Sequence, residues 1–302
     1  MHTTSLTLAT PRDFHFWRTA FSHGWCSLPP FSFDPDKKTL SRTLELAGGS
    51  IVDCTLRDAS HGVSIAVTSE SALTPSDRKE IRTTLASCLE LNFDLAGFYR
   101  HASRFPEFRW IPKSGSGRML RCPTVFEDAL KIICTTNCTW ALTTIMVTNL
   151  TRTAGHTQDG THYSFPSATA VSALSERELR QQCKTGYRAP FIKEFAGRVA
   201  SGELDVESWR ASDQPTPELI EEIGAIKGMG PYAVGNMLRL LYRHDSLALD
   251  SWVRSQFFRL HKKGRKVNDR VIERHYEKYG EWRGLMFWLE MVRHWHDGKF
   301  RL

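Results

Sequence analysis

One acidic residue, Asp250, stands in surroundings where a charge is unusual. It ends the apolar run LAL at 247–249 and is followed by SWV at 251–253. A buried carboxylate is costly unless it is paired or serves a function. Asp is also a preferred N-cap, and a helix can begin near Ser251, so a structural role is open. The two roles are compatible, because a cap fixes the direction of the carboxylate. A carboxylate held in this way can stabilise developing positive charge or activate water.

A glycine-containing turn lies upstream of Asp250, in the sequence IKGMGP at 226–231. Apolar residues recur at helical spacing on both sides, which predicts a helix–turn–helix unit over 219–243. We expect Gly228 and Gly230 to allow positive φ and the close approach of another backbone. The N–H groups of Gly230 and of the next helical turn have no intrahelical acceptor, so they suit a phosphate. An ordinary corner between helices would show the same pattern, so the turn alone does not separate the two interpretations.

The order of these features resembles the helix-hairpin-helix DNA glycosylases, the HhH-GPD superfamily. That family has a hairpin of the form LPGVG, a helix, and a short apolar run ending in Asp; here IKGMGPYAV is followed by LALD. The resemblance covers roughly residues 92–295. It implies that Asp250 is the catalytic carboxylate, which stabilises positive charge on the deoxyribose while the N-glycosidic bond of a flipped base breaks. It also implies that Lys227, Gly228 and Gly230 hold the DNA phosphates beside that nucleotide.

The resemblance also bears on metals. Helix-hairpin-helix proteins often bind a monovalent cation through hairpin carbonyls, and the matching carbonyls here belong to Gly224, Ile226 and Met229. They are a candidate site for a structural Na⁺ or K⁺. Some members carry four clustered cysteines for an iron–sulfur cluster after the Asp, but this chain has no cysteine beyond Cys183. We expect no iron–sulfur cluster, no catalytic metal and no other cofactor.

Two further segments resemble the 8-oxoguanine DNA glycosylase branch of the family. FEDALKIICTTN at 126–137 matches a core helix that ends in CSSN, and Asn137 is the matching asparagine. GYRA at 186–189 matches a motif that lies at the DNA strand. The resemblance implies that Tyr187 wedges into the base stack while Asn137 and Arg188 contact the orphaned partner base. If the resemblance is set aside, Asn137 is interpreted as the C-cap of a helix. Tyr187 and Arg188 are then interpreted as a surface pair at the start of the next helix.

The chain departs from this branch at the residue that would make it a lyase. Bifunctional members carry a Schiff-base lysine two residues after the second hairpin glycine, and here that residue is Tyr232. An aromatic side chain cannot form the imine. We therefore predict a monofunctional hydrolase without strand-nicking lyase activity.

The residues that would read the base also differ. Positions that carry Cys, Gln and His in the 8-oxoguanine branch hold Asn236, Phe287 and Trp252. The predicted base pocket comprises Gly24, Trp25, Tyr232, Asn236, Trp252, Phe287 and Trp288. Its aromatic rings favour a methylated, cationic purine through stacking and cation–π attraction, as in the 3-methyladenine glycosylases. Gly24 would offer its backbone to a base edge. We predict a glycosylase that acts on damaged purines, with alkylated purines as the favoured substrates. The alternatives are 8-oxoguanine as substrate and a non-catalytic hairpin DNA-binding module as function.

Composition agrees with a nucleic-acid partner. The formal charge is +7 and the pI is about 9.1, which favours a polyanion. No apolar run reaches the roughly eighteen residues that a membrane span needs, and we see no signal peptide at the N-terminus. The 7 cysteines form no CxxC pair, which argues for reduced thiols. We expect a cytoplasmic monomer, or a nuclear one in a eukaryote, that binds double-stranded DNA with a damaged base.

The chain divides by pattern into two predicted domains. Within residues 1–115, segments 43–46, 51–56 and 63–67 alternate apolar and polar residues, as half-buried antiparallel strands do. After the flexible stretch SGSG at 114–117 the pattern becomes helical, and residues 116–302 form the second predicted domain. The predicted fold class is α+β, with a mostly helical HhH-GPD core and an N-terminal antiparallel sheet domain.

Overall fold

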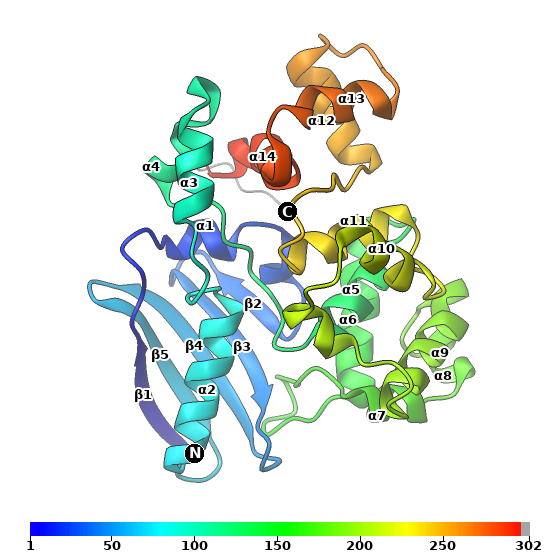
Figure 1. Cartoon of the computed structure of the whole chain (residues 1–302). Coiled ribbons are helices and arrows are strands. Elements are labelled where there is room, and N and C mark those ends of the chain that lie inside the picture. The colour runs from blue at the N-terminus through cyan, green and yellow to red at the C-terminus, as the bar shows by residue number, and fades with distance from the viewer. Residues whose placement is uncertain (297–302) are drawn as a thin grey trace. The chain divides into compact units, whose positions relative to one another are not determined.

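The computed structural model describes residues 1–296, apart from the side chain of His296. The fold is α+β, as predicted. The chain forms two compact units (Figure 1). Within the described residues, the first comprises 1–93 and 118–207, and the second comprises 94–117 and 208–296. None of the helices within residues 1–296 has the length and apolar character needed to cross a membrane.

The first unit contains one antiparallel sheet with the strand order β1-β5-β4-β3-β2. The strands are β1 (His2–Leu8), β2 (Phe31–Asp34), β3 (Thr39–Glu45), β4 (Ile51–Ala59) and β5 (Gly62–Ser69). The predicted strand segments fall in β3, β4 and β5. Alternate residues of β4 and β5 are buried, and Figure 1 shows α2 (Pro75–Cys88) lying across one face of the sheet. Strands β1 and β2, the two edge strands, were not predicted from the sequence.

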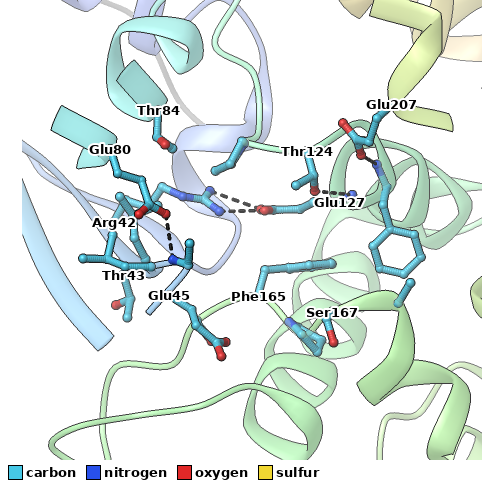
Figure 2. A pocket seen from close by; sticks show the side chains of 18 residues that line it. Arg42, Thr43, Glu45, Glu80, Thr84, Thr124, Glu127, Phe165, Ser167 and Glu207 are labelled. Carbon is cyan, nitrogen blue, oxygen red and sulfur yellow. Dashed lines mark hydrogen bonds and ion pairs between the residues drawn. The ribbon is translucent and has the colours of Figure 1, made fainter. Parts of the chain in front are cut away.

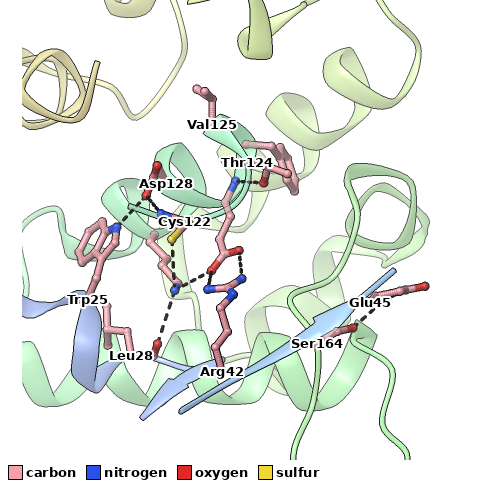
Figure 3. A network of polar contacts seen from close by, with 12 residues as sticks. Trp25, Leu28, Arg42, Glu45, Cys122, Thr124, Val125, Asp128 and Ser164 are labelled. Carbon is pink, nitrogen blue, oxygen red and sulfur yellow. Dashed lines mark hydrogen bonds and ion pairs between the residues drawn. The ribbon is translucent and has the colours of Figure 1, made fainter. Parts of the chain in front are cut away.

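Besides α2, the described residues of the first unit form six helices, which are α1 (Phe16–Ala20), α5 (Val125–Thr135), α6 (Trp140–Ala154), α7 (Ala168–Ala173), α8 (Glu176–Gln181) and α9 (Ala189–Ala200). Residues 125–134 of α5 are all buried; α6 and α9 pack against α5, and α7 and α8 pack against α9. Figure 3 shows the polar contacts that fasten α5 to the sheet. Glu127 forms ion pairs with Arg42 of β3 at 2.6 Å and with Lys131 at 2.8 Å. Burial alone would raise the pKa of Glu127, but these two cations lower it to about 2.

The second unit is helical. Its helices are α3 (Ala96–Ser103), α4 (Trp110–Ser114), α10 (Thr216–Gly224), α11 (Pro231–Leu240), α12 (Ser251–His261), α13 (Asp269–Glu277) and α14 (Arg283–Val292). Segment 94–117 packs with the C-terminal helices: the Phe98 and Trp282 rings lie 5.2 Å apart, and the Tyr279 hydroxyl donates to Glu107 at 3.1 Å.

The predicted domain boundary at 115/116 differs from this division. The stretch at 114–117, predicted to be flexible, does mark a change of unit, but the chain crosses between units again near residue 207. The reason is long-range pairing, since the buried ion pair of Arg42 with Glu127 joins β3 to a helix that the sequence pattern assigned to the other predicted domain. Removing one partner of such a buried pair typically costs about 3–5 kcal/mol. A sequence pattern does not show which segments form pairs of this kind.

Candidate active site

Asp250 is the N-cap of α12. Its backbone is extended, with φ −122° and ψ 179°, and its Oδ1 accepts a hydrogen bond from the Val253 N–H at 2.8 Å. The side chain is partly exposed. The capping role predicted for this residue is therefore confirmed. In the described part of the chain this cap engages only Oδ1, so Oδ2 is the oxygen available to a ligand.

Two glycines fix the segment that leads into Asp250. A Cβ on Gly235 of α11 would lie 2.8 Å from the Cα of Ala248, closer than real side chains approach. A Cβ on Gly284 of α14 would overlap the carbonyl oxygen of Ser246, and the Gly284 N–H donates to the His244 carbonyl at 2.6 Å. Helices α11 and α14 thus both pack directly onto the backbone that precedes Asp250. Neither glycine was predicted from the sequence to have this role.

Two arginines lie close enough to Asp250 to attract its negative charge. Arg239 is buried on α11, and burial lowers its pKa to about 10 against the opposing attraction of Asp250, so it stays cationic at neutral pH. Its guanidinium donates to Asn236 at 3.0 Å. Arg254 makes two hydrogen bonds to Asp269, at 2.7 and 2.8 Å, which raise the pKa of Arg254. Neither arginine was predicted from the sequence. Arg254 lies one helical turn after Asp250, and its N–H donates to the Asp250 carbonyl at 3.0 Å, whereas the fold brings Arg239 of α11 beside the acid.

An aromatic cluster follows Asp250 in the same unit. The Trp252 ring lies 6.2 Å from Trp288 and 5.3 Å from Trp295, measured between ring centroids. Trp252 is partly exposed, whereas Trp288 is 6% exposed and carries the Arg239 guanidinium 3.9 Å above its ring. Two predicted pocket residues, Trp252 and Trp288, are therefore neighbours.

The other predicted pocket residues of this unit lie on α11 and α14. Tyr232 and Asn236 are one helical turn apart, and the Asn236 amide donates to the Tyr232 carbonyl at 2.8 Å. Both are partly exposed. Phe287 is fully buried and packs edge-on against Tyr276, with 5.0 Å between ring centroids. A ring in that position is part of the core and has no open face for a base.

The hairpin turn between α10 and α11 is exposed at Lys227 and Gly230. Gly228 has φ +92°, as predicted, but Gly230 has φ −72° and ψ 179°, a conformation open to any residue. The expectation of positive φ at Gly230 is therefore wrong. Gly230 is the N-cap of α11, makes no side-chain cap, and has no atom within 4 Å of a Cβ built on it. The open space leaves the N–H groups of the turn accessible.

The hairpin carbonyls proposed for a cation belong to Gly224, Ile226 and Met229. The Ile226 carbonyl already accepts a hydrogen bond from the Met229 N–H at 2.9 Å, which closes the turn. A carbonyl oxygen has two lone pairs, so this bond leaves Ile226 able to accept a second partner. Cation binding at these carbonyls stays a prediction.

Asn137, Tyr187 and Arg188 gather at one corner of the first unit, although about fifty residues separate them in sequence. Arg188 is the last residue of the turn Gly186–Arg188, directly before α9, and is 3% exposed. Its guanidinium donates to the hydroxyl and the carbonyl of Thr136. Its guanidinium lies 4.5 Å from the Tyr187 ring, which is 51% exposed. Asn137 follows Thr136, is exposed, and has φ +47°, the left-handed conformation of a residue just beyond a helix.

Gly24 and Trp25 lie elsewhere in the first unit. Trp25 is 5% exposed and its indole N–H donates to Asp128 at 2.8 Å (Figure 3). The Trp140 ring covers Gly24 so closely that no Cβ would fit there. In this structure neither residue presents an open face to a base. Trp140, which fills the space over Gly24, was not predicted from the sequence.

The first unit also contains a cavity of about 570 Å³ between β3, α2 and α5 (Figure 2). Its carboxylates already have structural partners. Glu80 accepts from the Ala47 N–H at 2.9 Å, and Glu207 accepts from the N–H groups of Val125 and Phe126 at the start of α5. Glu127 is paired with Arg42. We assign this cavity no ligand.

Comparison with known proteins agrees with these features. No protein-family model matches the chain. A probable N-glycosylase/DNA lyase of Methanothermobacter thermautotrophicus is 25% identical over 228 residues, covering 68% of this chain and 72% of the relative. A 3-methyladenine DNA glycosylase from Archaeoglobus fulgidus superimposes with a TM-score of 0.73, 19% identity and full coverage of both chains. The chain has the fold of the helix-hairpin-helix DNA glycosylases. A Clostridium acetobutylicum 8-oxoguanine glycosylase/lyase bound to double-stranded DNA matches with a TM-score of 0.64 and 17% identity, over 88% of this chain and 98% of that one.

Within this helix-hairpin-helix glycosylase fold, the predicted residues form two sets. Asp250, the hairpin, Trp252 and Trp288 belong to the second unit, where Arg239 joins them. Asn137, Tyr187 and Arg188 form the set of the first unit.

Proposed function

We propose that the protein is a DNA glycosylase that hydrolyses the N-glycosidic bond of a damaged purine in double-stranded DNA. The observation that carries the proposal is Asp250, an acid held by its cap at the start of α12, directly after the hairpin and its second helix. The fold supports it, and so do the names of the relative and of the structural neighbours.

The chemistry follows from the way Asp250 is held. Bond cleavage builds positive charge on the deoxyribose, and a fixed carboxylate stabilises this charge without reorganising. The Val253 N–H orients the acid through Oδ1, and Oδ2 faces the sugar or the attacking water. Gly235 and Gly284 set the position of the acid through the backbone that precedes it. The target base must leave the stack to reach it.

Both sets of residues are proposed to contact the duplex. The exposed hairpin, with Lys227 and the N–H groups near Gly228 and Gly230, binds phosphate oxygens. In the first unit, the exposed ring of Tyr187 is the wedge between base steps. Arg188 orders the turn that displays Asn137 by bonding Thr136, so Asn137 and Arg188 act together on the orphaned base.

We propose that the enzyme is monofunctional. The hairpin helix presents Tyr232 where a Schiff-base lysine would be required, and a phenol cannot form an imine with the sugar. Lys227 lies before the turn and is assigned to phosphate. The Methanothermobacter thermautotrophicus relative is named a DNA lyase, and that part of its name describes the relative.

The substrates that we propose first are alkylated purines. The partly exposed Trp252, backed by Trp288 and Trp295, offers an aromatic surface, and a cationic base gains stacking and cation–π attraction on such a surface. One observation favours a neutral lesion such as 8-oxoguanine as the second candidate. The Arg239 guanidinium already occupies one face of Trp288, and its charge repels a second cation nearby.

A base-release assay tests the function and separates the two substrates. The purified protein is incubated with duplexes that contain 3-methyladenine, 7-methylguanine, 1,N6-ethenoadenine, hypoxanthine, uracil or 8-oxoguanine, and abasic sites are then cleaved with alkali. Release of methylated purines supports the first candidate, and release of 8-oxoguanine alone supports the second. Tight duplex binding with no release of any base would leave a non-catalytic DNA-binding module.

A further inference from the structure

Three potential metal ligands meet in the second unit, away from the proposed catalytic acid. They are His261 at the end of α12, His275 of α13 and Glu290 of α14, and their ligand atoms all lie within 4.8 Å of one another. His261 Nε2 is 3.2 Å from Glu290 Oε2, and the two imidazole rings are 4.4 Å apart between centroids. All three residues are partly buried. The cluster therefore joins three helices through side chains that favour the same kind of ion.

The spacing is close to what one metal ion would impose. Zinc binds imidazole nitrogen and carboxylate oxygen at about 2.0–2.2 Å, so neighbouring ligand atoms in a tetrahedral site lie about 3.4 Å apart. The pair of His261 and Glu290 already meets this spacing, and a small movement of His275 would complete a site with three ligands.

The surroundings of the cluster match those of a supported metal site. The Tyr276 hydroxyl donates to Glu290 Oε2, the oxygen that faces His261, and lies 3.5 Å from His261 Nε2, so it fixes the carboxylate beside the imidazole. The buried Phe257 ring packs against both imidazoles, at 4.8 Å from His261 and 5.4 Å from His275. His261 and Glu290 are each about one-fifth exposed, which leaves a path for an ion and for a water as fourth ligand.

We propose that His261, His275 and Glu290 bind one divalent transition-metal ion of the zinc class, with water in the fourth position. The ion would be structural with respect to DNA chemistry. His261 ends the helix that Asp250 caps, about 15 Å away along the helix axis. Glu290 lies two residues after Trp288 on α14. A bound ion would therefore fasten the helix that begins at the catalytic acid to the helix that carries part of the aromatic cluster.

Metal titration of the untagged, chelator-treated full-length chain tests this proposal. Co²⁺ is the probe, because its visible absorption reports tetrahedral nitrogen and oxygen ligands, and Zn²⁺ competition measures affinity. We expect one Co²⁺ per wild-type chain, displaced by Zn²⁺, and a higher Tm with Zn²⁺. His275→Asn and Glu290→Gln should each weaken binding by at least about 100-fold. Tyr276→Phe keeps all three ligands and should weaken binding roughly tenfold.

His162→Asn is the matched control. His162 and Asp159 are exposed and form a cluster with the partly buried Asp53 in the first unit, where the Asp159 carboxylate already accepts from the N–H groups of Thr161 and His162. This variant should bind Co²⁺ as wild type does. The proposal is overturned if wild type takes up no stoichiometric Co²⁺. It is equally overturned if binding survives in His275→Asn and Glu290→Gln. If one of these variants fails to fold, the other, together with Tyr276→Phe, decides the outcome.

Discussion

Gly235→Ala tests whether the close approach of α11 to the backbone before Asp250 positions the acid. The added Cβ would lie 2.8 Å from Ala248 Cα and 2.9 Å from Ala248 Cβ. Ordinary van der Waals contact begins at 3.4 Å, so the backbone at Ala248 must move by 3.4 − 2.8 = 0.6 Å to accept the new methyl group. Alanine in a helix interior gains about 0.5–1 kcal/mol over glycine, whereas such overpacking costs roughly 1–3 kcal/mol. We expect a net destabilisation of about 1 kcal/mol.

The effect on activity should exceed the effect on folding. A displacement of about 1 Å at a catalytic group can cost 100-fold in rate, so a shift of roughly half that size should lower single-turnover base release about tenfold. Urea unfolding followed by tryptophan fluorescence measures stability, and base release under saturating enzyme measures the chemical step. Affinity for the lesion duplex should change little, because the hairpin that binds phosphate is unaltered.

Gly197→Ala is the matched control for this substitution. Gly197 lies inside α9, and a Cβ there would meet no atom within 4 Å. This variant should be as stable as wild type or more stable by up to about 1 kcal/mol, with unchanged activity. If Gly235→Ala behaves in the same way as Gly197→Ala, the reasoning about the close approach is refuted.

Three further predictions concern separate parts of the molecule. Burial and the nearby Arg239 lower the pKa of His244 to about 3 from 6.5, so the unfolded chain binds the proton more tightly and stability falls as pH drops below 6.5. His244→Phe should reduce the loss of unfolding free energy between pH 7.5 and 5 by about 2 kcal/mol. The same pH dependence in the variant and in wild type would contradict the assignment of this loss to His244. Arg188→Ala should weaken binding to a lesion duplex roughly tenfold in a titration, and unaltered affinity would remove Arg188 from the site. Borohydride should trap no covalent complex with DNA, and a trapped species would refute the assignment made from Tyr232.

The sequence predicted the parts of the fold that depend on local patterns. Strands β4 and β5 alternate because one face of each is buried, and β3 alternates in sequence although Glu45 is its only exposed residue. In contrast, β1 buries only Leu6 and Leu8, and β2 has four residues. The cap at Asp250 was also predictable, because a capping residue acts on its own chain neighbours. The edge strands carry a weaker pattern and were missed for that reason.

The features of the fold and of the site that were not predicted depend on contacts between segments that are distant in the sequence. Gly235 and Gly284 look like ordinary small residues in helical patterns until Ala248 and Ser246 are placed against them. Phe287 and Trp288 are adjacent on α14, and only packing decides that the Phe287 ring is enclosed by the core. Arg239 was overlooked because its significance comes from Trp288, which lies far along the chain, and from Asp250, which belongs to a different helix.

The most direct test of the central claim is single-turnover base release by wild type and Asp250→Asn, with duplex affinity measured on the same samples. Asparagine also caps helices, so α12 and the fold should persist while the negative charge is lost. We predict that base release falls by about 1,000-fold and that affinity for the lesion duplex stays within about threefold of wild type. Release by Asp250→Asn at the wild-type rate would contradict the assignment of Asp250 as the catalytic carboxylate.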